Sequence, residues 1–383
     1  MSAADGNRSE HDFRTTVKRI CLLGIVLLFL LAGQARAMET DEILQYQADA
    51  LGLDGLQRSA EEYAPDMDWT QTPDLNSGLS DLLETGTESL HGVVKKALRS
   101  GLLLLAIVLL SSLAESAAAC GTGKTIQAAP VAAALAITAV AVADANTLIG
   151  LGSEVIEKME LFSKVLLPTV AAATAASGSP GGAAARQLAA MLFSDLLMTL
   201  INRLLLPLVY AYIAACTAYA AIGNEGLKRI AAMLKWVVTS ILTTVLLAFV
   251  GYLTVSGVIA GTTDALTIKA AKFTVSSMVP VVGGILSDAS ETVLAGAAIL
   301  KNSVGVFGML VVLGMCIVPF LQLGVHYLMY KITAALSATV ADSRTAGLID
   351  GIGGAFGLVL GMAGACALLL LVSLVSAITI LSP

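Results

Sequence analysis

The stretch NSVGVFGMLVVLGMCIVPFLQLGVHYLMY, residues 302–330, decides the fold because it contains no Asp, Glu, Lys or Arg. An α-helix needs about 20 mostly apolar residues to cross a hydrocarbon core about 30 Å thick. This stretch is longer than that. Its apolar residues do not alternate with polar ones, as they would in a strand of a membrane β-barrel. It therefore predicts a transmembrane helix.

Other stretches of the chain also lack charged side chains, and they extend this prediction along the sequence. The stretch 236–263 and the C-terminal stretch 351–383 are long enough to span a membrane alone, whereas 100–114 is short. The remaining stretches are 125–143, 165–185 and 204–224. We predict an all-α, polytopic membrane protein with about six or seven transmembrane helices after an N-terminal signal peptide.

The overall composition agrees with a chain embedded in lipid. Of the 383 residues, 57% are hydrophobic and 13% are charged, against about 25% charged in a soluble domain. Mean hydropathy is +0.84. So few charges could not cover the surface of a soluble enzyme. The net charge of −6 argues against nucleic acid as a partner.

The N-terminal residues 1–37 have the features of a secretory signal peptide. Arg14, Lys18 and Arg19 precede the apolar run 20–32, and Ala35-Arg-Ala37 fits the small-x-small cleavage rule. Cleavage would leave Met38 as the first residue. The alternative is an uncleaved signal anchor.

Residues 38–99 form an acidic segment that we expect outside the cytoplasm, ahead of a polytopic membrane domain at 100–383. Between Glu39 and His91 there are 13 acidic residues and a single basic one. The cations Lys95, Lys96 and Arg99 oppose this placement, because loops rich in Lys and Arg favour the cytoplasm. By the same rule, the predicted loop around Glu154 and Glu160 belongs outside. Residues Lys228, Arg229, Lys235, Lys331 and Arg344 favour the cytoplasm.

Ionisable residues inside apolar stretches are costly in lipid and mark candidate functional positions. Asp195 and Asn202 are seven residues apart, so a helix would place them on one face, with Arg203 close by. One interpretation is a polar seam that lines a pore or contacts a partner helix. The alternative is a turn at Asn202-Arg203, ahead of Pro207, with Arg203 reaching the interface.

A second polar interruption lies in the segment 277–300. Two short apolar arms flank Ser287-Asp-Ala-Ser-Glu291, so Asp288 and Glu291 are further candidates for a pore or polar seam. The arms fit a re-entrant hairpin, which protein or water must cover. They also fit an amphipathic segment that lies in the membrane interface.

Gly353, Gly357 and Gly361 recur every four residues in the last apolar stretch, a spacing that permits close helix packing in lipid. The sequence leaves open whether the partner helix belongs to the same chain.

No catalytic, metal or cofactor site is predicted. Gly121-Thr-Gly-Lys-Thr125 resembles a phosphate-binding loop, but Ala118 stands where the motif needs Gly, so we expect no bound nucleotide. The cysteines stand singly, and the histidines His11, His91 and His326 form no metal-ligand spacing.

Most of the predicted mature chain also resembles a known family, most strongly from about Lys269 to Gly308. The stretches Ala270-Ala-Lys-Phe273, Val279-Pro-Val-Val-Gly283, Ser287-Asp288 and Leu300-Lys-Asn-Ser-Val-Gly-Val306, followed by Asp342-Ser-Arg-Thr345 and the glycine-rich last helix, resemble the stage III sporulation protein AE family. The resemblance implies a mother-cell protein in the membrane around the forespore. It also implies an assembly with other membrane subunits, ring-forming subunits and an ATPase, thought to form a channel between the two cells.

The leading hypothesis is therefore a non-enzymatic membrane subunit of a multi-protein channel or export apparatus that links mother cell and forespore during endospore formation. The alternative is a stand-alone secondary transporter or permease. A transporter would favour repeat symmetry, and no internal repeat is visible.

Overall fold

The structure is a computed structural model that describes residues 40–61, 75–119, 128–177, 180–278 and 283–379. The chain divides into two units, and only 40–46 of the first unit, Met1–Tyr46, are described. They form the start of helix α2 (Thr40–Leu51). The second unit runs from Gln47 to Pro383. The predicted signal peptide, 1–37, lies outside the described residues.

Almost all of the second unit that the structure describes is helical. The short helix α3 (Leu53–Ala60) is followed by the long helices α4 (Leu75–Ala119), α5 (Ala128–Ala176), α6 (Pro180–Leu200), the π-helical turn η1 (Ile201–Leu205), α7 (Leu206–Ile222), α8 (Glu225–Met278), α9 (Gly283–Ser337) and α10 (Ser343–Thr379).

Within these described ranges, six helical segments are long and apolar enough to cross a membrane: Leu75–Ala114, Val131–Ala176, Gln187–Ile222, Glu225–Val255, Leu294–Ser337 and Ser343–Ile378. The prediction of an all-α polytopic fold is confirmed.

Two predicted boundaries inside the membrane domain are wrong. The stretches 125–143 and 165–185 do not make two spans, because α5 continues from one into the other without a break. The region around Glu154 and Glu160, predicted as an extracytoplasmic loop, is helix interior. Ion pairs between side chains four residues apart hold these charges on the helix surface, so the charged region does not interrupt the helix.

The segment 277–300 also differs from its predicted form. Helix α8 ends at Met278 and α9 begins at Gly283, so the chain is helical and continuous through Ser287-Asp-Ala-Ser-Glu291. The polar residues therefore do not form a loop between two arms, while a re-entrant placement of the segment stays a prediction. Placement of this segment in the membrane interface stays a prediction.

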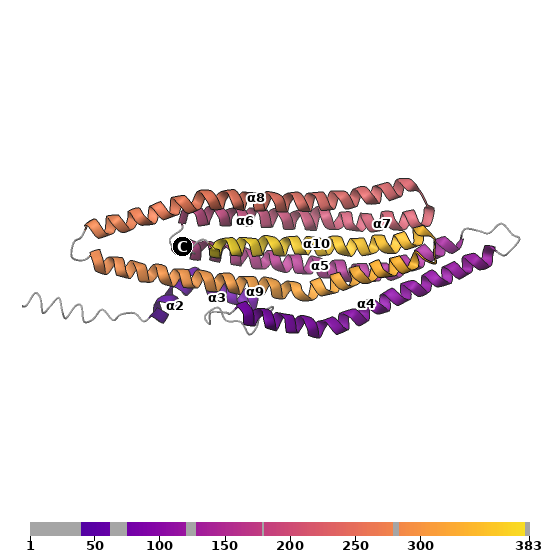
Figure 1. Cartoon of the computed structure of the whole chain (residues 1–383), viewed down its shortest axis with the longest axis horizontal. Coiled ribbons are helices and arrows are strands. Elements are labelled where there is room, and N and C mark those ends of the chain that lie inside the picture. Colours follow the sequence, from indigo (N-terminus) through magenta and orange to yellow (C-terminus); the bar gives the residue numbers. More distant parts are fainter. Residues whose placement is uncertain (1–39, 62–74, 120–127, 178–179, 279–282, 380–383) are drawn as a thin grey trace, which may run out of the picture. The chain divides into compact units, whose positions relative to one another are not determined.

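Helix α10 lies at the centre of the packing and contacts α5, α6, α7, α8 and α9 (Figure 1). Its buried side chains include Phe356, Val359 and Met362. The Phe356 ring packs edge-on against the Tyr330 ring of α9, with centroids 5.0 Å apart. Because lipid tails are as apolar as these side chains, close contact rather than escape from water holds such helices together.

The glycine row of α10 packs against helices of the same chain. A Cβ at Gly353 would lie 2.9 Å from the Cβ of Tyr330, and one at Gly357 would lie 3.0 Å from the Tyr327 ring. A Cβ at Gly361 would meet only Leu242 of α8, at 3.8 Å. The close approach is therefore concentrated at the first two glycines, on α9.

The connections α7–α8 and α9–α10 lie next to each other at one end of the unit. Gly223 ends α7 in the left-handed conformation, with φ +73°, and donates its N–H to the Tyr219 carbonyl. A Cβ there would also lie 2.6 Å from the Arg344 guanidinium at the start of α10. The basic residues predicted to favour the cytoplasm therefore gather at this end of the bundle.

Candidate functional site: a polar face on helices α5 and α6

The middle of α5 has charged side chains on its surface. Lys158 pairs with Glu154 at 3.0 Å, and Lys164 pairs with Glu160 at 2.7 Å. Each pair joins side chains one turn apart on the same helix. They neutralise part of the local charge, but the Glu154 and Lys164 side chains stay 58% and 57% exposed.

The contacts of α5 place this charged region beside the most apolar parts of its neighbours. On one side of the charges, Gly152 packs against Val359 of α10. On the other side, Leu166 packs against Gly308 of α9. The charged segment 154–164 therefore lies alongside the charge-free lengths of α9 and α10, at the depth where those helices would meet the lipid interior.

Asp195 of α6 joins this charged region. It shares a cavity of about 280 Å³ with Glu160 and Lys164. The other lining residues are Ser163, Leu167, Met191, Leu192 and Ser194. The Asp195 side chain is exposed, so the carboxylate adds to the polar surface that the two helices share.

Asn202 and Arg203 extend the polar surface along the same helical rod. Both are exposed and lie in η1, the π-helical turn that joins α6 to α7 without a break. The predicted alternative, an interfacial turn at these residues, is therefore wrong. Pro207 explains the π-turn, because proline has no N–H for the Arg203 carbonyl and its ring clashes with that carbonyl in a regular α-helix.

The polar face defined by Glu154, Lys158, Glu160, Lys164, Asp195, Asn202 and Arg203 cannot remain in contact with lipid. A charged side chain at the centre of a membrane helix costs about 2.5–3.5 kcal/mol even on the lower scales. The face must meet water or polar groups of another protein surface. Among the described residues, no three His, Cys, Asp or Glu side chains are placed to bind a metal ion.

A second polar contact lies inside the helix packing, and the sequence interpretation missed it. The Tyr330 hydroxyl of α9 donates a hydrogen bond to Asp144 of α5, with 2.8 Å between the oxygens. Tyr330 is fully buried and Asp144 is partly buried. The available signal was Asp144 itself, a lone carboxylate at the end of the charge-free stretch 125–143.

The other candidate residues are not brought to this face by any described contact. Asp288 and Glu291 belong to α9, but their side chains lie outside the part of the chain that the structure describes. Residues 121–125, which resemble a phosphate-binding loop, also lie outside it.

Comparison with known proteins identifies the family. The family model described as stage III sporulation protein AE matches residues 75–381. The chain belongs to the stage III sporulation protein AE family. The match begins with α4 and covers all six candidate spans of the described residues. It leaves out the preceding acidic residues 38–74.

A curated relative supports this assignment. The protein named stage III sporulation protein AE from Bacillus subtilis strain 168 is 28% identical over 190 residues. The alignment covers 49% of this chain and 47% of the relative, so the chain spans about half the length of the curated relative it matches. No solved structure matches the chain. This AE-family chain is thus a sporulation-related membrane protein.

Proposed function

We propose that the chain is a non-enzymatic subunit of a multi-protein channel or export apparatus that links mother cell and forespore during endospore formation. The observation that supports this most is the polar face on α5 and α6. Its charges lie at the depth of the apolar lengths of α9 and α10. A subunit that lines a water-filled passage, or packs against other subunits, needs such a face.

The same reasoning gives an orientation and a location. Lys228, Arg229 and Arg344 lie at the end of the unit where α7 meets α8 and α9 meets α10. The positive-inside rule favours the cytoplasm for this end. The start of α4, which belongs to the predicted extracytoplasmic segment 38–99, then lies on the other side. In a sporulating cell this topology fits the mother-cell membrane around the forespore.

Partners follow from the exposure of the outer helices. Buried residues make up 61% of the apolar window of α10 and 56% of that of α9, but only 22% of that of α4 and 17% of that of α8. The outer helices thus have most of their surface available for lipid or for other subunits. We expect those subunits to include the membrane and ring-forming proteins of the sporulation complex.

A stand-alone secondary transporter is the competing function, and purification separates the two. The chain is purified from sporulating cells and from a heterologous host, and the protein from the second source is placed alone in liposomes. A complex subunit retains other proteins when it comes from sporulating cells and moves no solute alone. Solute uptake by the isolated chain would overturn the proposal in favour of the transporter.

A further inference from the structure

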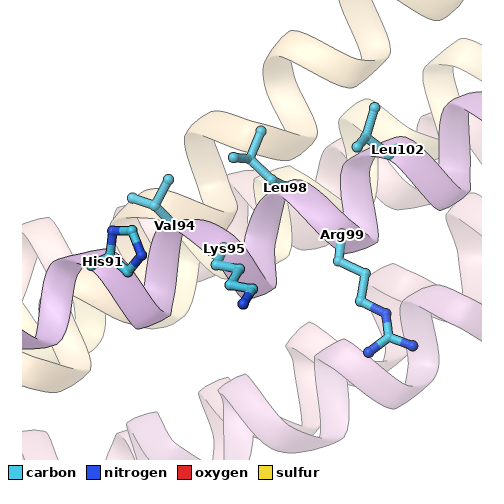
Figure 2. Close-up of a pocket in the computed structure, with 6 residues that line it drawn as sticks. All are labelled: His91, Val94, Lys95, Leu98, Arg99 and Leu102. Carbon is cyan, nitrogen blue, oxygen red and sulfur yellow. The ribbon is translucent and has the colours of Figure 1, made fainter.

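A shallow groove runs along α4, on a part of the molecule that the proposed function does not use. It has a volume of about 520 Å³ and is lined by His91, Val94, Lys95, Leu98, Arg99 and Leu102. Figure 2 shows Val94, Leu98 and Leu102 along one edge of α4 and Lys95 and Arg99 along another. At about 100° per residue, the six side chains occupy one arc of about 140° on the helix surface.

Two cations of this groove have no polar partner among the described residues. Lys95 and Arg99 are exposed and make no hydrogen bond or ion pair with any described residue. By contrast, Lys331 binds Asp350 at 2.6 Å and Arg344 binds Asp342 at 2.7 Å. No described residue therefore neutralises these two neighbouring cations.

An apolar stripe adjoins these cations. Leu98 is 44% exposed and Leu102 is 62% exposed, and Val94 lies one turn before Leu98. The stripe continues toward the start of α4 through exposed Leu90 and Leu83. Exposed Glu84 and Glu88 lie beside this part of the stripe. The match to an anionic amphiphile therefore rests on Lys95, Arg99 and the adjoining apolar side chains.

The groove also lies at a depth where lipid headgroups are expected. Gly101 of α4 packs against Met329 and Thr333 of α9. These two residues lie on either side of Lys331 in the sequence. Across the packing, Gly353 approaches Tyr330, and Gly354 lies near Lys235 of α8. Arg99 therefore lies within one helical turn of the height of Lys331 and Lys235, where the charge-free lengths of α8, α9 and α10 begin or end. Lys95 lies about one turn further toward the start of α4.

We infer that this groove binds an anionic phospholipid from the cytoplasmic leaflet. Its phosphate meets Lys95 and Arg99, because a guanidinium can donate two parallel hydrogen bonds to phosphate oxygens. Its acyl chains lie along Val94, Leu90 and Leu83. Basic pockets on the cytoplasmic side of membrane helices bind anionic headgroups in this way. The choice of leaflet rests on the orientation proposed above, whereas lipid binding itself needs no other subunit.

The test uses the full-length protein, purified in detergent and titrated with phosphatidylglycerol or phosphatidylcholine, with bound lipid measured by native mass spectrometry. We expect phosphatidylglycerol to be retained in preference to phosphatidylcholine. The double variant Lys95→Gln/Arg99→Gln should bind phosphatidylglycerol roughly 30-fold more weakly. Each cation near an anionic surface contributes about a fivefold to sixfold increase in affinity, so the loss of two multiplies to about this factor. The variant Lys228→Gln/Arg229→Gln removes the same charge outside the groove and should bind as the parent does.

Several results would overturn the inference. One is equal retention of the two lipids by the parent protein, and another is equal loss of binding in both double variants. A third is that Lys95→Gln/Arg99→Gln leaves lipid retention unchanged but loses a co-purifying protein, which would assign the groove to a protein partner. Thermal unfolding of both variants without added lipid separates loss of binding from loss of the fold.

Discussion

The α9–α10 pair and the α5–α6 face lie at the same depth but differ in chemistry. Along α9 and α10, glycines and large apolar side chains meet at van der Waals distance, and most residues of the α10 window are buried. Along α5 and α6, charged side chains remain exposed at that depth. The contacts of the first region are all made within the chain, and they hold the fold. The charged side chains of the second region need water or another polar surface, so we assign function to that region.

The largest expected effect comes from the close contact of Gly353 with Tyr330. Gly353→Leu should lower the free energy of unfolding by about 3 kcal/mol or prevent folding, because overfilling a close-packed interface forces helices apart. Thermal unfolding in detergent measures this. Gly361→Ala is the matched control and should unfold as the parent does, since its Cβ has room. Equal stability of the two variants would contradict the packing described for α10.

A smaller effect is expected at the buried bond between α5 and α9. Tyr330→Phe removes the donor to Asp144 and should cost about 1–3 kcal/mol, because a partly buried carboxylate then lacks a partner. Asp144→Asn keeps an acceptor oxygen for the Tyr330 hydroxyl and should cost less. The unfolding midpoints of the two variants in one detergent give the order. A Tyr330→Phe protein as stable as the parent would show that this bond contributes nothing.

The polar face should respond in the opposite way, with an effect on function rather than on stability. Asp195→Leu should reduce the yield of heat-resistant spores while changing the free energy of unfolding by less than about 0.5 kcal/mol, as for most exposed substitutions. Leu196→Ala alters the next exposed side chain of α6 and should leave spore yield unchanged. Normal spore yield with Asp195→Leu would remove the functional difference between the two regions.

The smallest effect concerns the loop between α9 and α10, outside both regions. Burial tends to raise the pKa of Asp342, but hydrogen bonds and attraction from Arg344, with help from the Ser343 hydroxyl, lower it overall. A lowered carboxyl pKa stabilises the fold above the ordinary pKa of about 4, and the gain is lost as the pH falls through the folded value.

This exposed pair should contribute less than about 1 kcal/mol. The difference in unfolding midpoint between the parent and Arg344→Gln should therefore be small and constant from pH 7 to pH 5, and should vanish at more acidic pH. A difference in unfolding midpoint that grows as the pH falls would contradict a lowered pKa for Asp342.

The contrast between the two regions also explains how much could be predicted from the sequence. Charge-free stretches such as 302–330 identify α9 and α10 because a lipid-depth helix needs only length and apolarity. Searching for charge-free stretches divided α5 in two, because Glu154 and Glu160 indicate a loop. Their ion pairs with lysines one turn away, which allow a continuous helix, are not considered by that search. The spacing of Asp195 and Asn202 predicts that they share one helix face. The approach of Lys164 to Asp195 depends on the packing of α5 against α6, which the sequence of either helix alone does not predict.

The depth of individual cations in the membrane is also hard to predict from the sequence. Lys95 and Arg99 conflict with the charge rule while α4 is taken as a span that begins at residue 100. The structure extends α4 back to Leu75 and places Arg99 close to the height of Lys331. Under the proposed orientation, this end of α4 faces the cytoplasm and the conflict does not arise. The Tyr330–Asp144 bond joins positions 186 residues apart, so sequence spacing could not predict it.

The central claim is that the α5–α6 face meets water rather than lipid, and cysteine labelling in native membranes tests it most directly. Asp195→Cys and Leu247→Cys, an exposed position in the charge-free length of α8, are treated with a charged, membrane-impermeant thiol reagent in membranes from sporulating cells. The described native cysteines Cys216, Cys316 and Cys366 are buried, and the parent protein gives the background. We predict labelling at position 195 and none at 247. Two positions equally unreactive, as for side chains in lipid, would contradict the claim.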